Sequence, residues 1–308
     1  MEKYKRWADV PEHLKSKTYC NKNRLSLKNI KPCAMVYQYI NRTWVDLYDI
    51  RNLDPKPSLT PKQLKGILQA NKTREDLYTC KLCKTFSTRT VSKETHLCKE
   101  CFKLHKDSLY HTNIAIHALN RRLSWTNPET RDKFVILDIE STGLNYDDEV
   151  VEIAIVDTSG NTLYNQLIKP SKPIPSEVVE LHGITNEMVY NAPNISEVAE
   201  ELDIILKDKT ILAFNSSFDQ RILEYSLSKY NIIRSYKWDC VMYNQMEILE
   251  TDRYISLINS VGDTFIQEHR AKSDCMLIYH LITDYEWINS ELQRKEKEKK
   301  QIENLLCL

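Results

Sequence analysis

Two carboxylates lie two residues apart in the apolar stretch FVILDIESTGL, residues 134–144. Side chains at positions i and i+2 of a β-strand point to the same face, so Asp138 and Glu140 would lie side by side. Two adjacent negative charges repel each other, and burial strengthens the repulsion. A divalent cation is the usual counter-charge for such a pair, so this stretch predicts a metal site.

Two further carboxylates stand at the ends of predicted elements. Asp219 follows the apolar strand TILAFN at the start of a helix, and Asp274 lies where a helix begins after the loop in EHRAKSDC. Four carboxylates would balance the charge of two divalent cations, which prefer oxygen ligands. Two such cations can activate water and neutralise charge on a phosphodiester, so the set is compatible with phosphodiester hydrolysis.

Four motifs in this order resemble those of the DEDDh 3′–5′ exonucleases: FVILDIESTGL, LHGIT (181–185), AFNSSFD (213–219) and HRAKSD (269–274). This group includes the proofreading subunit of bacterial replicative polymerase and RNase T. The resemblance covers about residues 132–286 and implies an RNase H-like fold, a mixed β-sheet flanked by helices.

The resemblance also implies roles for individual residues. Asp138, Glu140, Asp219 and Asp274 would hold two Mg²⁺ or Mn²⁺ ions, and His269 would be the general base. A histidine side chain is largely neutral at pH 7–8 and can accept a proton from water. The residues expected near the terminal nucleotide are Thr142, Gly143, Leu144, His182 and Phe218. Leu144 and Phe218 could instead be core residues, and His182 could cap the loop around Gly183.

A second metal site is predicted by the cysteine spacing C-x2-C-x14-C-x2-C, formed by Cys80, Cys83, Cys98 and Cys101. Two such pairs can complete a tetrahedron around one structural Zn²⁺, as in a zinc ribbon. A redox-active pair is the alternative, and His96 or His105 could replace one ligand. With four sulfur ligands no coordination position stays open, so the expected role is structural.

The hydrophobic pattern predicts a mixed α/β chain. The predicted strands are CAMVYQYI, TWVDLYDI, KFVILDIE, EVVEIAIVDT, TLYNQLIKP and TILAFN. The predicted helices are TPKQLKGILQANK, SLYHTNIAIHALNRRL, SEVVELHGI, SEVAEELDIILKD, FDQRILEYSLSKY and AKSDCMLIYHLITDYEWI.

These elements divide the chain into five predicted segments: a basic module at 1–76, the cysteine module at 77–106, a helix and linker at 107–131, the exonuclease domain at 132–286 and a charged tail at 287–308. The tail carries opposite charges at i,i+4 spacing, which predicts a solvated helix that frays.

Charge is distributed unevenly along a chain whose net charge is zero. Residues 1–130 hold 25 Lys and Arg against 12 Asp and Glu, and the remaining residues hold 18 against 31. A basic N-terminal half is expected to touch a polyanion. Its Tyr37, Tyr39, Trp44 and Tyr48 could take part, although aromatic residues at alternating spacing are more often core residues.

Composition narrows the class of protein further. The chain has 42% hydrophobic and 28% charged residues, which is typical of a globular protein of about two domains. Neither a signal peptide nor a membrane span is visible, so a cytoplasmic location is expected.

We therefore expect a metal-dependent 3′–5′ exonuclease that releases nucleoside monophosphates from single-stranded or frayed ends, with DNA favoured. One alternative is an RNA-trimming exoribonuclease. Another is a nucleic-acid-binding adaptor that uses the nuclease fold as a platform. The N-terminal module or the C-terminal tail could also bind a protein partner.

Overall fold

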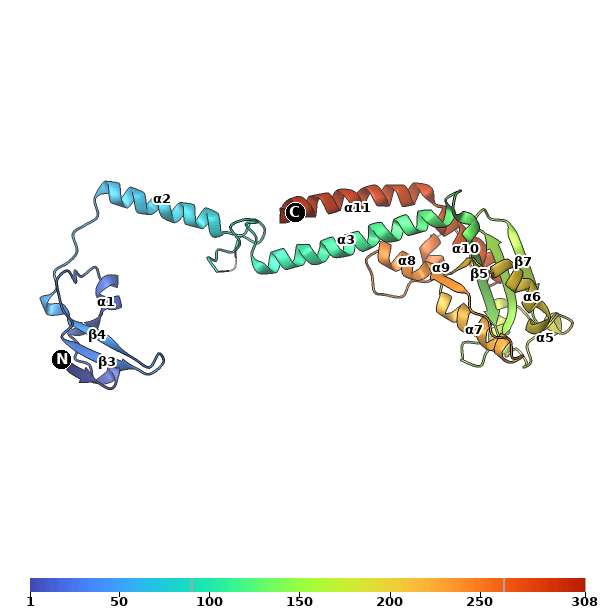
Figure 1. Ribbon diagram of the computed structural model, residues 1–308, viewed down its shortest axis with the longest axis horizontal. Helices are drawn as coiled ribbons and strands as arrows, with labels where there is room; N and C mark the ends of the chain where they lie inside the picture. Colours follow the sequence, from blue (N-terminus) through green and yellow to red (C-terminus); the bar gives the residue numbers. More distant parts are fainter. Residues whose placement is uncertain (90, 263, 308) are drawn as a thin grey trace. The chain divides into compact units, whose positions relative to one another are not determined.

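The computed structural model describes residues 1–89, 91–262 and 264–307 (Figure 1). The chain divides into two compact units, the N-terminal unit Met1–Tyr78 and the C-terminal unit Thr79–Leu308. From Thr79 onward, the predicted cysteine module, helix and linker, exonuclease domain and tail all lie in the C-terminal unit. The boundaries between these four segments remain a prediction. None of the described helices is long and apolar enough to cross a membrane.

The N-terminal unit is built on a small sheet with strand order β1-β3-β4-β2, in which only β1 and β3 are parallel. Its elements are β1 (Glu2–Tyr4), β2 (Leu14–Ser16), α1 (Lys17–Lys22), β3 (Ala34–Gln38), β4 (Thr43–Asp49), α2 (Pro61–Tyr78) and the 3₁₀ turns Trp7–Asp9 and Ile50–Asn52. The two strands predicted here are confirmed as the antiparallel pair β3 and β4. One face packs Ala34, Val36 and Leu47 into a small core.

The helix α2 begins where the sequence predicts. The Thr60 hydroxyl accepts a hydrogen bond from the Gln63 backbone N–H at 3.3 Å, and the Gln63 side chain accepts one from the Thr60 N–H at 2.9 Å. This reciprocal pair forms a capping box, with Pro61 in the first turn. None of the α2 residues is buried.

The C-terminal unit is centred on a five-stranded sheet of order β7-β6-β5-β8-β9, drawn in green to orange in Figure 1. Its strands are β5 (Phe134–Ser141), β6 (Val150–Asp157), β7 (Thr162–Leu167), β8 (Thr210–Ala213) and β9 (Lys237–Cys240). The strand β6 is antiparallel to both neighbours, whereas β5, β8 and β9 are parallel. The expected mixed α/β architecture is confirmed.

Helices cover both faces of this sheet. They are α3 (Lys99–Thr126), α4 (Ser176–His182), α5 (Asn186–Val189), α6 (Ile195–Leu206), α7 (Ser216–Ser228), α8 (Val241–Ile248), α9 (Leu257–Val261), α10 (Ala271–Thr283) and α11 (Tyr285–Leu306), with a 3₁₀ turn at Arg131–Lys133. Val135, Leu137 and Ile139 of β5 pack on the side of α6 and α7. Ile136 packs on the opposite side, against α8, α10 and the end of α3. Side chains alternate along a strand, so Asp138 and Glu140 point to the same face as Ile136, which is the face covered by α10.

The helix expected within residues 107–131 belongs to the 28-residue helix α3, which starts in the cysteine module and ends beside the sheet. Arg122 is fully buried, and its Nε donates to Asn244 Oδ1 of α8 at 2.8 Å. The Asn244 side chain in turn donates to the Ala118 carbonyl at 2.8 Å. These buried hydrogen bonds join α3 to α8.

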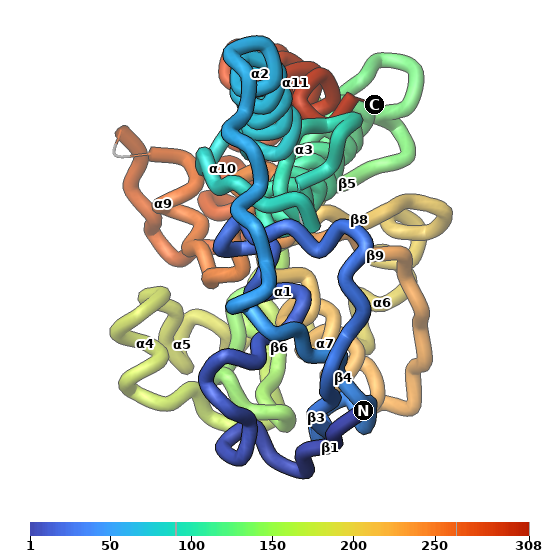
Figure 2. The backbone as a smooth tube through the Cα atoms, turned by 90° about the vertical axis from the view of Figure 1, so that its left-hand side faces the viewer, coloured from blue at the N-terminus to red at the C-terminus, as the bar shows by residue number. Residues whose placement is uncertain are grey.

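The C-terminal tail differs from the expected frayed helix. Figures 1 and 2 show α11 running alongside α3, because Ile288 packs with Leu119 and the last turn packs Ile302 and Leu306 against the cysteine module. Lys295 is also buried, and it pairs with Glu250. The expected single last helix is divided at Asp284, whose carboxylate accepts from the Trp287 N–H at 3.0 Å and so starts α11. Ile288, Ile302 and Leu306 of the tail therefore pack against other parts of this unit.

Packing of α11 can be tested with Ile288→Ala. Ile288 is fully buried, so truncation should lower the free energy of unfolding by about 2–5 kcal/mol through lost burial and a cavity. Urea unfolding followed by circular dichroism measures this change. Ile204→Ala removes the same atoms from an exposed site on α6 and should cost less than about 0.5 kcal/mol. Equal effects of the two substitutions would contradict the packing described for α11.

Candidate active site and metal centre

The carboxyl ends of β5 and β8 place three of the expected acidic residues at one edge of the sheet. Asp138 and Glu140 lie at the end of β5, where the pairing with β6 shifts register between Glu140 and Ser141. Asp219 lies in the first turn of α7, directly after β8. Its Oδ1 accepts a hydrogen bond from the Ile139 N–H at 3.1 Å, so α7 is joined to the strand between the two β5 carboxylates.

The fourth carboxylate comes from α10. Asp274 lies in the first turn of this helix, and the Gln267 side chain donates to its Oδ2 at 2.6 Å. Oxygen atoms of Asp138, Glu140 and Asp274 all lie within 4.8 Å of one another. These three residues, Asp219 and His269 line one cavity of about 280 Å³. The structure thus brings together all five residues that the sequence singled out.

Burial and mutual repulsion make these carboxyls hard to ionise. Burial, followed by the charges of Asp219 and Glu140, raises the pKa of Asp138 well above its usual range. Burial and the nearby Asp274 raise the pKa of Glu140 to about 8, and burial raises the pKa of Asp219 to about 8. The pKa of Asp274 is raised by burial as well. The site therefore favours either bound protons or bound cations.

The donor set fits divalent cations. Neither Lys nor Arg lines the cavity among the residues that the structure describes, so no side chain there balances the carboxylates. In addition, Asp274 Oδ1 is buried without a hydrogen-bond partner. A buried carboxylate oxygen left unpaired is costly unless a ligand takes it, and Mg²⁺ or Mn²⁺ would be suitable because both prefer oxygen.

His269 is held in place by its neighbours along the chain. Its backbone adopts φ +52°, in the left-handed region, at the turn that leads into α10. The next residue, Arg270, forms an ion pair with the buried Glu152 of β6, and the same carboxylate accepts from the Ala271 N–H at 3.0 Å. Glu152 is thus neutralised by Arg270, and the turn that carries His269 is anchored to the sheet.

The five residues expected near a terminal nucleotide are placed differently from one another. Leu144 is 80% exposed, and Phe218 lines the cavity. Thr142 is buried, where its hydroxyl donates to Asp148 at 2.8 Å. Gly143 lies so close that a Cβ would stand 2.6 Å from the Asp148 carboxylate. Thr142 and Gly143 therefore shape the loop, while Leu144 and Phe218 present surface.

The remaining predicted contact, His182, is buried at the end of α4. Its Nδ1 accepts from the Ile184 N–H at 3.0 Å, so Nε2 carries the proton and donates to the Ser141 carbonyl at 3.3 Å. Burial lowers the pKa of His182, which keeps the ring neutral. This arrangement matches the capping alternative and fixes the loop after β5.

Sequence reasoning missed several residues that position the site. Arg221 of α7 donates to the carbonyls of Leu144 and Asn145, and its guanidinium lies 5.1 Å from the Tyr146 ring centroid and so holds the loop after β5. Glu152 stands directly opposite Glu140 in the antiparallel register, so the motif EVVEIAIVDT carried a signal for it. For Gln267 and Arg221 the sequence held no comparable signal.

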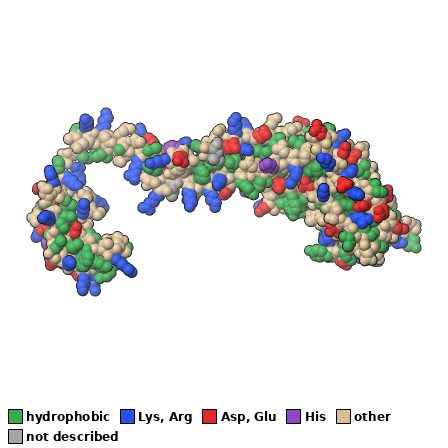
Figure 3. Space-filling view, in the orientation of Figure 1, with side chains coloured by type: hydrophobic (Ala, Val, Ile, Leu, Met, Phe, Trp, Pro, Cys, Tyr) green, Lys and Arg blue, Asp and Glu red, His purple; other side chains and the backbone are tan. Residues whose placement is uncertain are grey.

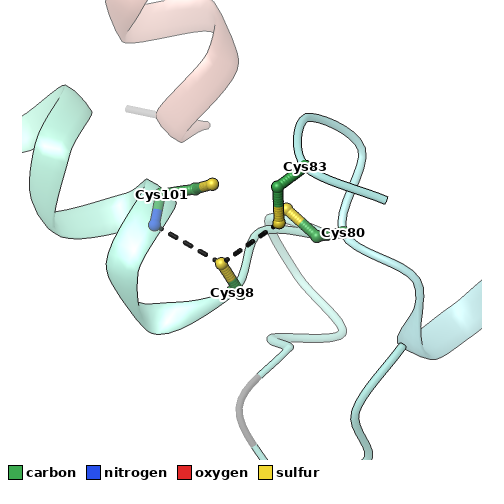
Figure 4. A group of neighbouring side chains, drawn as sticks. All are labelled: Cys80, Cys83, Cys98 and Cys101. Carbon is green, nitrogen blue, oxygen red and sulfur yellow. Dashed lines mark hydrogen bonds between the residues drawn. The ribbon is translucent and has the colours of Figure 1, made fainter. Parts of the chain in front are cut away.

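The cysteine module forms a second cluster. Cys80 and Cys83 come from a tight turn, while Cys98 caps α3 and Cys101 lies in its first turn (Figure 4). The four sulfur atoms lie within 4.8 Å of one another, and those of Cys83 and Cys98 are 3.7 Å apart. Ligands 2.3 Å from a tetrahedral zinc ion would be about 3.8 Å apart, so the cluster fits such an ion.

The electrostatics of these sulfurs also favour a cation. Burial alone would raise the pKa of Cys80, but hydrogen bonds from the backbone of Cys98, Cys83 and Leu82 lower it to about 6. Hydrogen bonding to Cys98 and burial raise the pKa of Cys101 to about 12. The Cys80 thiolate therefore forms readily, whereas Cys101 would ionise only beside a positive charge.

Comparison with known proteins adds a family. The exonuclease family model named RNase T matches residues 135–282. Exonuclease CP81 of Escherichia phage 186 is 35% identical over 101 residues, which cover 33% of this chain and 52% of that protein. The PolC-type DNA polymerase III of Thermotoga maritima is 34% identical over 151 residues, 46% of this chain and 11% of that protein. The chain thus spans about half the length of the phage relative and about a tenth of the polymerase.

Among solved structures, exonuclease X in complex with 5′-overhanging duplex DNA is 24% identical, with a TM-score of 0.39 over 56% of this chain and 99% of that chain. The family model covers the strands and helices that carry Asp138, Glu140, Asp219, His269 and Asp274. Residues 135–282, just under half of the chain, are therefore similar to the RNase T family of exonucleases.

Proposed function

We propose that this protein is a metal-dependent 3′–5′ exonuclease that removes nucleoside monophosphates from single-stranded or frayed ends. The observation that carries the proposal is the convergence of four carboxylates, of which Asp219 and Asp274 are buried, and one histidine on a single cavity that lacks a balancing cation among its described residues. Two Mg²⁺ or Mn²⁺ ions are the proposed cofactors, held by Asp138, Glu140, Asp219 and Asp274. A DNA substrate is favoured by the similarity to DNA polymerase III.

The residues that line the cavity would have different roles in the reaction. Cations bound by the four carboxylates would supply positive charge to the attacking and leaving oxygens of the phosphodiester. His269 would take the proton from the attacking water. The ion pair between Arg270 and Glu152 would keep the His269 side chain beside the cavity. Exposed Leu144 and half-buried Phe218 would pack against the terminal base.

Bond changes in this reaction balance without a further reactant. The water oxygen bonds to phosphorus while the bond from phosphorus to the 3′ oxygen breaks. The departing 3′ oxygen takes up a proton, and a nucleoside monophosphate leaves.

Reduced cysteines suit a cytoplasmic setting for this chemistry, since all nine are free of disulfides.

Asp138→Asn tests the catalytic proposal. The substitution removes a central cation ligand while keeping the size of the side chain, so Mg²⁺-dependent cleavage should fall at least about 100-fold, beyond the loss usual for residues that only support ligands. The assay follows 5′-labelled DNA and RNA oligonucleotides, single- and double-stranded, whose ladders report polarity and preference. Asp132→Asn, at the opposite end of β5, is the matched control and should keep activity. Retained cleavage in Asp138→Asn, or shortening from the 5′ end, would contradict the proposal.

Metal binding predicts a pH-dependent stabilisation. Folded carboxyls with raised pKa values hold protons that the unfolded chain releases, so the metal-free protein should lose stability as the pH rises from about 4 toward 8. Mn²⁺ at 100 times its dissociation constant would add about 2.7 kcal/mol, or about 5–10 °C in melting temperature. Protons compete with the metal, so the rise should be larger at pH 8 than at pH 6, and smaller in Asp138→Asn. An equal rise in both proteins would place the metal elsewhere.

We propose in addition that Cys80, Cys83, Cys98 and Cys101 hold one structural Zn²⁺. Purified protein should then contain one zinc per chain by elemental mass spectrometry, and Cys98→Ser should lose it. Cys33→Ser, which changes an exposed cysteine outside the cluster, should retain the metal. Full zinc content in Cys98→Ser, or a disulfide between cluster cysteines in the native protein, would favour the redox alternative.

A further inference from the structure

The open face of the small N-terminal sheet carries three aromatic residues. Tyr37 of β3 and Trp44 of β4 stand directly opposite in register, with ring centroids 5.3 Å apart. The Tyr39 ring lies 4.9 Å from Tyr37 in an edge-on arrangement, in the hairpin that joins the two strands. Tyr39 is 66% exposed and Trp44 40% exposed. We call Tyr37, Tyr39 and Trp44 the aromatic platform.

The platform is not part of a core. The small core of this sheet lies on the other face, with Ala34, Val36 and Leu47. Tyr48 of β4 points to the same sheet face as Trp44, but it is buried against α1 together with Cys20. Packing therefore explains Tyr48 but leaves Tyr39 and Trp44 exposed to water, and adjacent exposed aromatic rings are typical of a binding surface.

Positive charge surrounds the platform. The Lys3 ammonium lies 5.3 Å from the Trp44 ring centroid, and Arg42 occupies the hairpin turn after Tyr39. One acidic residue, Asp46, shares this sheet face. The N-terminal unit as a whole holds 16 Lys and Arg against 8 Asp and Glu, and Figure 3 shows Lys and Arg side chains spread over its visible surface.

We propose that the aromatic platform is a nucleic-acid site separate from the catalytic cavity, and that its ligand is single-stranded nucleic acid. Exposed rings offer stacking surfaces for bases that are unpaired, and the flanking cations suit the phosphates between them. A proline-rich peptide also docks on aromatic residues, but it brings no negative charge to match the excess of Lys and Arg.

Strand binding by the platform would offset the acidic charge of the C-terminal unit. Residues 79–308 hold 27 Lys and Arg against 35 Asp and Glu, so that unit repels phosphates beyond the reach of its own metal site. A basic, aromatic unit on the same chain raises the local concentration of substrate strand. This role in holding substrate rests on the proposed exonuclease function, whereas binding of the strand by the platform does not.

Fluorescence anisotropy with a labelled single-stranded oligonucleotide tests the platform in the full chain. The Asp138→Asn background without added divalent cation keeps the strand intact and the cysteine module loaded. Trp44→Ala and Tyr39→Ala should each weaken binding about fivefold or more, because one stacked base contributes about 1–3 kcal/mol. Lys3→Gln should lower the slope of log affinity against log salt by about 0.7, while the aromatic substitutions leave that slope unchanged.

Tyr190→Ala is the matched control. Tyr190 is 68% exposed and has Lys169 over its ring at 4.8 Å, yet it belongs to the C-terminal unit, so binding should not change. Near-ultraviolet circular dichroism checks that the small sheet is folded, and Tyr39→Ala in the hairpin decides the matter if Trp44→Ala unfolds it. Unchanged affinity in folded Tyr39→Ala, or loss of affinity for an uncharged proline-rich peptide in place of the oligonucleotide, would overturn the proposal.

Failure of the platform and failure of the exonuclease proposal give different results. A chain that degrades oligonucleotides with Mg²⁺ but binds them equally well in all platform variants has the enzyme function without the platform. A chain that never cuts, yet loses strand binding in Tyr39→Ala and not in Tyr190→Ala, has the platform without the enzyme function.

Discussion

Repulsion among four closely placed carboxylates, two of them buried, is the constraint on which the C-terminal unit depends. The strand β5 ends, and the helices α7 and α10 begin, at the same edge of the sheet, so these groups lie in one cavity. Backbone and side-chain donors hold two of them, through Ile139 and Gln267. Arg270, which follows His269 in the chain, is paired with Glu152. Negative charge is thus positioned but left unbalanced, which suits a site that must bind metal before it can act.

Much of this site could be predicted from the sequence because its logic is local. Alternation in FVILDIESTGL fixes that Asp138 and Glu140 share a face, and strand-to-helix junctions place Asp219 and Asp274 at element ends. The rest depends on contacts between distant segments. Nothing near His182 in the chain reveals that its ring would donate to the Ser141 carbonyl, and nothing near Arg221 shows that it holds the loop after β5.

The same limit applies to α11. Its charged repeat resembles a solvated helix in sequence, since charged residues dominate its composition. The apolar residues Ile288, Ile302 and Leu306 are widely spaced, and their partners lie in α3 and the cysteine module, about 170 or more positions earlier. Charge is also divided between the two units, so that the acidic chemistry of one is accompanied by a basic surface on the other. This division is compatible with a net charge of zero.

Closure of the cysteine module by α11 has a consequence for biosynthesis. Cys80, Leu97 and Cys98 share one apolar cluster with Ile302 and Leu306, more than 200 positions later. During translation the sulfur ligands leave the ribosome long before the residues that shield them, so the nascent module remains open to solvent and to thiol oxidation. Early capture of a metal ion by the four cysteines would protect them during this interval.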